Sequence, residues 1–135
     1  MPDPEDVRLV AERWFSKAVA DLQAARLMHE AGDRTEPWIA VFHAQQAAEK
    51  AMKAMLVIEQ IPFPKSHDLE RIRGLLPSTS GLPPATEMAV LSQVALVSRY
   101  PDIGLGAEPD REDAVSAVDL AGRVVDAIRA AMSAR

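Results

Sequence analysis

The chain has 135 residues, a formal net charge of −5 and no cysteine, so disulfides, thiolate metal sites and thiol catalysis are excluded. Hydrophobic residues make up 48% of it and charged residues 26%, which is typical of one globular domain spanning residues 1–135, with a core from about 6 to 132. The acidic start lacks the order of a signal peptide and no apolar run approaches the roughly 20 residues of a membrane span, so we expect a cytoplasmic protein without membrane contact.

The first two expected helices cover about residues 6–31 and 35–60. Apolar side chains recur every three or four positions along the first, and Gly32 is expected to end it. Thr35 is the expected N-cap of the second helix, with Pro37 in its first turn. Because the second helix is apolar over much of its circumference, we expect it at the centre of the fold or at a dimer interface.

Three further helices are expected after a proline-rich break. A short helix should start at Ser66 as its N-cap and end near residue 76. The next should cover residues 85–99 and end before a proline. The last should start at Asp110, with Asp113 as its capping-box partner, and run to about residue 132.

The pattern as a whole predicts an all-α fold. Alanine is abundant and strand-like alternation is nearly absent, which favours helices throughout. The short connections imply that consecutive helices are antiparallel neighbours. We therefore predict an antiparallel up-and-down bundle of four long helices plus one short helix.

Charge is distributed unevenly along this acidic chain. Residues 1–42 and 74–135 each carry five basic and eight acidic groups, a net −3, whereas residues 43–73 carry five basic and four acidic groups, a net +1. The overall sign argues against a general nucleic-acid coat protein. An anionic ligand would be expected at the middle segment, although a solvated charged face would give the same pattern.

Polar residues interrupt the apolar faces of the first two helices. One stripe of the second helix holds His43, Gln46, Lys50 and Lys53 among apolar neighbours, and Asp21 lies on the apolar face of the first helix. Since a buried unpaired charge is costly, we expect Asp21 to pair with Lys50 or Lys53 across the two helices. Such a cluster either fixes the packing register or forms an anion-binding or catalytic site.

Two other positions carry groups that suit a phosphate ligand. His67 follows two prolines beside Lys65, where it is either a surface residue or a proton donor and phosphate contact. Arg99 stands beside Tyr100 at a helix end, where a basic residue suits the dipole and the pair also suits a phosphate-and-base ligand. The scattered histidines lack ligand spacing, so we expect no metal and no cofactor.

Four segments, taken together, resemble one known family. They are residues 20–25 (ADLQAA), 42–54 (FHAQQAAEKAMKA), 66–69 (SHDL) and 99–102 (RYPD). The sequence resembles the HEPN (higher eukaryotes and prokaryotes nucleotide-binding) family from about residue 10 to 130.

The resemblance implies a bundle of four or five helices, often a homodimer, with a minimal nucleotidyltransferase as its partner in a toxin–antitoxin module. It also implies nucleotide binding. The expected ligand-binding residues are Lys50, Lys53, His67, Arg99 and Tyr100. The polar residues expected to have a structural role are Asp21, His43, Gln46 and Glu49.

Some members of the family are metal-independent ribonucleases, in which an arginine precedes a histidine by four to six intervening residues. The positions at that distance before His29, His43 and His67 hold no arginine, so the sequence argues against an enzyme. Three hypotheses follow: a non-catalytic module that binds a nucleotide or a partner, a divergent ribonuclease toxin, and a purely structural dimerisation domain. In the ribonuclease hypothesis His67 is the acid/base and Arg99 stabilises the phosphate.

Overall fold

The computed structural model describes residues 2–100, 102 and 108–135, and within them the chain forms α-helices and one 3-10 turn but no strand. This confirms the all-α prediction. The elements are α1 (Pro4–Glu30), η1 (Gly32–Arg34), α2 (Pro37–Ile58), α3 (Leu69–Gly74), α4 (Ala85–Arg99) and α5 (Arg111–Ser133). Pro101, which was expected to end the fourth helix, lies outside the described residues, as do residues 103–107.

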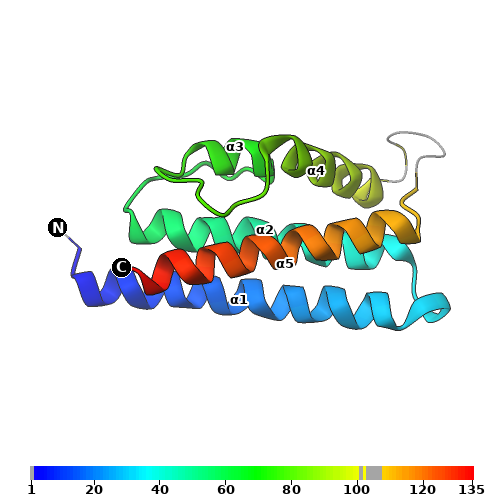
Figure 1. Ribbon diagram of the computed structural model, residues 1–135, viewed down its shortest axis with the longest axis horizontal. Coiled ribbons are helices and arrows are strands. Elements are labelled where there is room, and N and C mark those ends of the chain that lie inside the picture. Colours follow the sequence, from blue (N-terminus) through cyan, green and yellow to red (C-terminus); the bar gives the residue numbers. More distant parts are fainter. Residues whose placement is uncertain (1, 101, 103–107) are drawn as a thin grey trace.

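The four long helices alternate in direction, as an up-and-down bundle requires. Figure 1 shows α1 along one side of the molecule, α2 returning beside it, and α3 and α4 on the opposite side of α2. The last helix, α5, runs back so that both termini lie at the same end of the bundle. Short connections thus produce antiparallel neighbours, as expected.

Helix α2 forms the centre of the bundle, because it packs against each of the other α-helices. Thirteen of its 22 residues are buried, many of them alanines that let the neighbouring helices approach closely. Its largest fully buried apolar side chains are Met52 and Leu56. The central position within one chain explains the broad apolar circumference of α2, so this feature alone does not require a dimer interface.

Two helix starts differ from the expectation. Helix α1 begins at Pro4 rather than residue 6, because Asp3 is its N-cap and accepts a hydrogen bond from the Glu5 amide at 2.8 Å. Thr35 does not cap α2; the N-cap position is occupied by Glu36, whose side chain makes no capping bond. The Thr35 hydroxyl instead donates to the Met28 carbonyl at 2.8 Å and so satisfies the end of α1.

The N-cap of α3 is Asp68 and not Ser66. The Asp68 carboxylate accepts from the amides of Glu70 and Arg71 at 3.1 and 3.3 Å, whereas the Ser66 hydroxyl accepts from the Asp68 amide at 3.1 Å. A carboxylate adds charge compensation at the positive end of the helix, which favours Asp68 over a hydroxyl. His67 therefore precedes the helix instead of lying in its first turn.

The other expected cap forms as predicted. Asp110 and Asp113 make the reciprocal bonds of a capping box at the start of α5, at 2.9 and 3.0 Å. Gly32 ends α1 with a φ of +59°, a conformation that a side chain would strain. None of the described helices is both long and apolar enough to cross a membrane.

Candidate functional site

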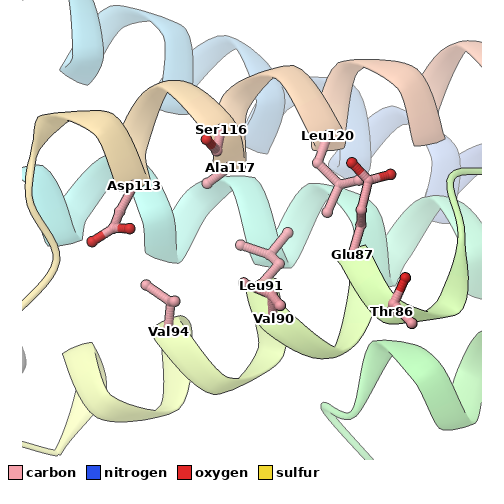
Figure 2. Close-up of a pocket in the computed structure, with 9 residues that line it drawn as sticks. All are labelled: Thr86, Glu87, Val90, Leu91, Val94, Asp113, Ser116, Ala117 and Leu120. Atoms are coloured by element: carbon pink, nitrogen blue, oxygen red, sulfur yellow. The ribbon is translucent and has the colours of Figure 1, made fainter.

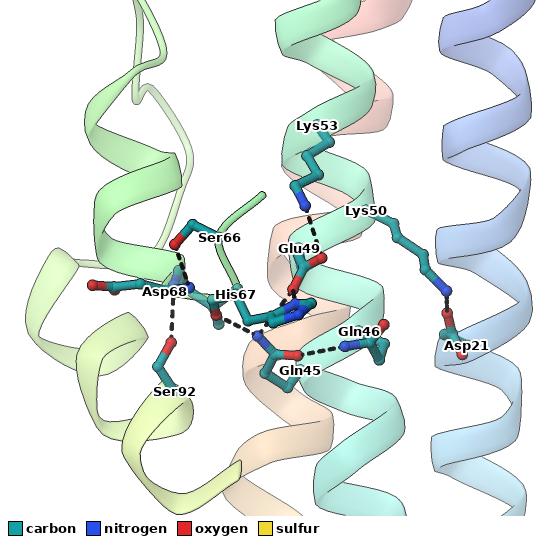
Figure 3. A network of polar contacts seen from close by, with 11 residues as sticks. Asp21, Gln45, Gln46, Glu49, Lys50, Lys53, Ser66, His67, Asp68 and Ser92 are labelled. Carbon is teal, nitrogen blue, oxygen red and sulfur yellow. Dashed lines mark hydrogen bonds and ion pairs between the residues drawn. The ribbon is translucent and has the colours of Figure 1, made fainter. Parts of the chain in front are cut away.

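A buried carboxylate at the middle of α2 organises the largest polar network (Figure 3). The Glu49 side chain is only 4% exposed, and its Oε2 lies 2.9 Å from the Lys53 Nζ. Its Oε1 lies 2.8 Å from the His67 Nδ1. Because Glu49 and Lys53 are one helical turn apart, they share a face of α2. An ionised carboxylate can only accept, so Nδ1 of His67 carries the proton in this contact.

The backbone around His67 is also fixed. Gln45, one turn before Glu49, donates from its Nε2 to the His67 carbonyl at 2.7 Å, and Gln46 donates to the Gln45 Oε1 at 2.9 Å. On the other side, the Ser92 hydroxyl of α4 accepts from the Leu69 amide at 2.9 Å (Figure 3). Side chains from α2 and α4 therefore hold the segment that presents the His67 imidazole.

Lys53 is enclosed by aromatic rings. Its side chain is 7% exposed, and its Nζ lies 5.8 Å from the ring centroid of Trp14 and 5.4 Å from that of Phe63. These distances allow cation–π attraction in addition to the ion pair with Glu49. The ammonium is thus compensated inside the protein by a carboxylate and two aromatic rings.

The expected ion pair across the first two helices forms with Lys50. Its Nζ lies 2.6 Å from the Asp21 Oδ2, and the Asp21 Oδ1 lies 3.0 Å from the Nδ1 of His43. The Asp21 side chain is 15% exposed, so both contacts compensate a largely buried carboxylate. The sequence did not decide which of the two lysines would pair with Asp21. In the structure Lys50 pairs with Asp21, and Lys53 pairs with Glu49.

Three of the five expected ligand residues line one groove between α3 and α4. His67, Arg99 and Tyr100 face a cavity of about 420 Å³, whereas Lys50 and Lys53 do not line it. The His67 side chain is 62% exposed, and its Nε2 makes no hydrogen bond within the described part of the chain. Gln45, Ser92 and Gln93 add hydrogen-bonding groups to the walls of this cavity, which we call the α3–α4 groove.

Arg99 is the cation of the α3–α4 groove that no carboxylate pairs with among the described residues. Its guanidinium carbon lies 5.1 Å from the centroid of the Phe42 ring, a distance that allows cation–π attraction. Its Nε is buried and has no hydrogen-bond partner within residues 2–100, 102 and 108–135. Of the acidic groups in the groove, Asp68 is engaged in capping α3 and Glu70 is exposed.

A second hollow lies between α4 and α5 and is mostly apolar (Figure 2). Its volume is about 310 Å³, and Val90, Leu91 and Leu120 contribute to its walls. Glu87 at its edge accepts hydrogen bonds from Arg123, which raise the pKa of that guanidinium. None of the residues expected to bind a ligand lines this hollow.

Only some contacts of the polar network could have been predicted from the spacing of residues in the sequence. Gln45, Glu49 and Lys53 follow one another at intervals of four, so their shared face of α2 was predictable. The contacts of Phe42 with Arg99 and of Ser92 with the start of α3 could not have been predicted from spacing, because they depend on how α4 packs against the neighbouring helices. Among the described residues, no group of three or more histidines and carboxylates is placed to hold a metal ion.

The fold and the network together define a class of protein: a helical bundle in which a carboxylate on the central helix, Glu49, contacts a histidine, His67, at the edge of an open groove. The chain belongs to the HEPN family, since the family model of the HEPN domain matches residues 11–131. This confirms the resemblance seen in the sequence. No curated protein matches the chain.

Two solved structures share the fold. One is ST0689, described as an archaeal HEPN homologue, with 28% identity and a TM-score of 0.70 over 90% of this chain and 97% of that one. The other is TT1696 from Thermus thermophilus, with 27% identity and a TM-score of 0.72 over 88% of this chain and 95% of that one. The likeness therefore extends over nearly the whole domain in each case.

Proposed function

We propose that this HEPN domain is a non-catalytic module that binds a nucleotide in the α3–α4 groove. The observation that carries the proposal is the convergence of His67, Arg99 and Tyr100 on one open cavity. His67 comes from a part of the chain well separated from the adjacent Arg99 and Tyr100, and the polar network holds His67 in place without using its Nε2.

The chemistry of the groove suits such a ligand. A guanidinium and an imidazole are common phosphate contacts, and Arg99 has no carboxylate partner among the described residues to compete with a phosphate. Gln45 and Gln93 offer amide donors and acceptors, and the exposed Glu70 carboxylate can accept from a sugar hydroxyl or an exocyclic amine.

Lys50 and Lys53 are not proposed to contact the nucleotide directly, because Lys50 is paired with Asp21 and Lys53 is paired with Glu49.

Membership of the HEPN family also suggests which proteins this chain associates with. We propose a homodimer in a toxin–antitoxin pair with a minimal nucleotidyltransferase, as the HEPN resemblance implies. A gene for a small nucleotidyltransferase beside this one, and a complex of the two products after co-expression, would support the pairing. Failure of the co-expressed proteins to associate would count against it.

Replacing Arg99 by alanine is expected to weaken nucleotide binding about tenfold or more. A hydrogen bond to a charged group contributes roughly 1.5–3 kcal/mol, and each 1.4 kcal/mol is about a factor of ten in affinity. Isothermal titration calorimetry with ATP would measure the loss, and His67→Ala is expected to act in the same direction.

Arg129→Ala is the matched control for this titration. Arg129 also lies over an aromatic ring, 5.4 Å from the Phe15 centroid, but it does not line the groove. Its removal should leave ATP affinity unchanged. The proposal fails if wild-type protein gives no binding heat with ATP or other nucleotides, or if both arginine variants lose affinity equally.

A divergent metal-independent ribonuclease is the second candidate. The contact between Glu49 and His67 Nδ1 supports it, because a carboxylate that orients one ring nitrogen leaves the other available for proton transfer. Arg99 in the same groove would stabilise charge on the phosphate. This candidate predicts growth arrest on expression, relieved by His67→Ala in protein that remains folded. Benign overexpression of the wild type would argue for the binding module or for a purely structural role.

A further inference from the structure

Arg99 also lines a second, separate cavity. It has a volume of about 520 Å³, and Trp38, Phe42, Ser98, Arg99 and Glu108 line it. We call it the Trp38 cavity. Trp38 and Phe42 are one turn apart at the start of α2, so they share a helix face, and Arg99 comes from the end of α4.

The walls of the Trp38 cavity are planar and partly exposed. Trp38 is 37% exposed, so part of its ring is accessible to a ligand. The Arg99 guanidinium carbon lies 5.1 Å from the Phe42 ring centroid, so a cation and an aromatic ring are in contact at one wall. Aromatic and guanidinium faces of this kind bind planar rings by stacking, largely without regard to base identity.

A second observation limits the kind of ring. A purely hydrocarbon ring offers no hydrogen-bond donor to the Glu108 carboxylate that lines the cavity, whereas a heteroaromatic ring with an amino group can donate to it. The carboxylate of Glu108 at the same cavity disfavours an anionic group there.

Arg99 also connects the two cavities, because it lines both the Trp38 cavity and the α3–α4 groove. A ligand with a planar ring on one end and an anionic group on the other can therefore contact both. We propose that the Trp38 cavity is a stacking subsite for the heteroaromatic ring of a ligand whose phosphate lies beside His67 in the α3–α4 groove. This inference rests on the proposed function and adds the residue, Trp38, that recognises the ring.

Tryptophan fluorescence and calorimetry with three probes test the subsite: ATP, adenosine and inorganic triphosphate. The chain has two tryptophans, so a Trp14→Phe variant leaves Trp38 as the sole reporter. We expect ATP and adenosine to quench Trp38 saturably and triphosphate not to do so. Trp38→Ala should weaken ATP binding about tenfold and leave triphosphate binding unchanged. Trp38→Leu, which keeps an apolar side chain but no ring, should behave like Trp38→Ala and serves if the smaller variant does not fold.

The outcomes separate this inference from the proposed function. ATP binding that depends on Arg99 and His67 but is indifferent to Trp38→Ala and Trp38→Leu, without quenching, would overturn the subsite and leave the proposed function standing. Saturable quenching by adenosine with no effect of His67→Ala on ATP affinity would support the subsite and count against the phosphate position. Quenching by phenylalanine amide but not by adenosine would show that the cavity takes an aromatic side chain of a protein, and it would overturn the inference.

Discussion

Replacing Lys53 by methionine is expected to lower the free energy of unfolding by about 3 kcal/mol. The substitution removes the ammonium that compensates Glu49, whose side chain is 4% exposed. Breaking a buried ion pair by deleting one partner typically costs about 3–5 kcal/mol, because the remaining charge stays buried. The lower end is expected here, since His67 and Gln45 still contact the Glu49 carboxylate. Chemical denaturation followed by circular dichroism would measure the change.

Lys50→Met is the matched control on the same helix. It removes the same charge from a pair with Asp21, but the Lys50 side chain is 25% exposed, so water can partly replace the lost contact. A cost of about 1 kcal/mol or less is expected, as for a partly exposed ion pair. If Lys53→Met destabilised the protein no more than Lys50→Met, the buried network would not be a main stabilising element.

A double variant tests whether the contributions of Glu49 and Lys53 to the free energy of unfolding depend on each other. Glu49→Gln combined with Lys53→Met removes both charges and leaves neutral groups of similar size. The combined loss of stability is expected to be smaller than the sum of the two single losses, because each single variant leaves one buried charge uncompensated. Additive losses would mean that the two side chains act independently.

Ile72→Ala is expected to cost about 2–5 kcal/mol and to disturb the α3–α4 groove. Helix α3 has six residues, too few to be stable alone, and its only buried side chains are Leu69 and Ile72, both fully buried. Truncating a buried isoleucine removes apolar contact and leaves a cavity. Because α3 follows His67 directly, we expect ATP affinity to fall together with stability in a titration at a temperature where the variant is folded.

Val115→Ala controls for the loss of a β-branched residue from a helix. Val115 is 51% exposed on α5 and away from the groove, so its truncation should change stability by no more than about 0.5 kcal/mol. An Ile72→Ala variant as stable as Val115→Ala would show that α3 is not anchored through its apolar side chains.

The helices could be predicted closely because their signals are local. Helix α5 was expected from Asp110 to about residue 132, and it covers Arg111–Ser133 with the expected capping box. The start of α3 was predicted less well, since Ser66 and Asp68 are both good caps and stand two residues apart. Choosing between them depended on the path of the chain from α2, which local sequence does not specify.

The site was predictable only in part. Because a buried unpaired charge is costly, a buried Asp21 needs a cation nearby. Its ion pair across the first two helices could therefore be predicted. Whether Lys50 or Lys53 supplied that cation depended on the rotation of α2 against α1. The contact between Glu49 and His67 joins residues 18 positions apart, and no periodicity links them.

The amino-acid sequence was enough to establish a helical bundle, because apolar periodicity, caps and helix-breaking residues act over a few neighbouring positions. Its membership of the HEPN family was indicated separately, by the resemblance of four short segments, and is shown by the family model. Which polar groups meet became clear only from the folded chain. Folding placed Lys53 between Trp14 and Phe63, turned His67 toward the α3–α4 groove and set Arg99 between two cavities. These contacts depend on how the helices cross and rotate against one another, and that geometry is set by the packing of the whole core.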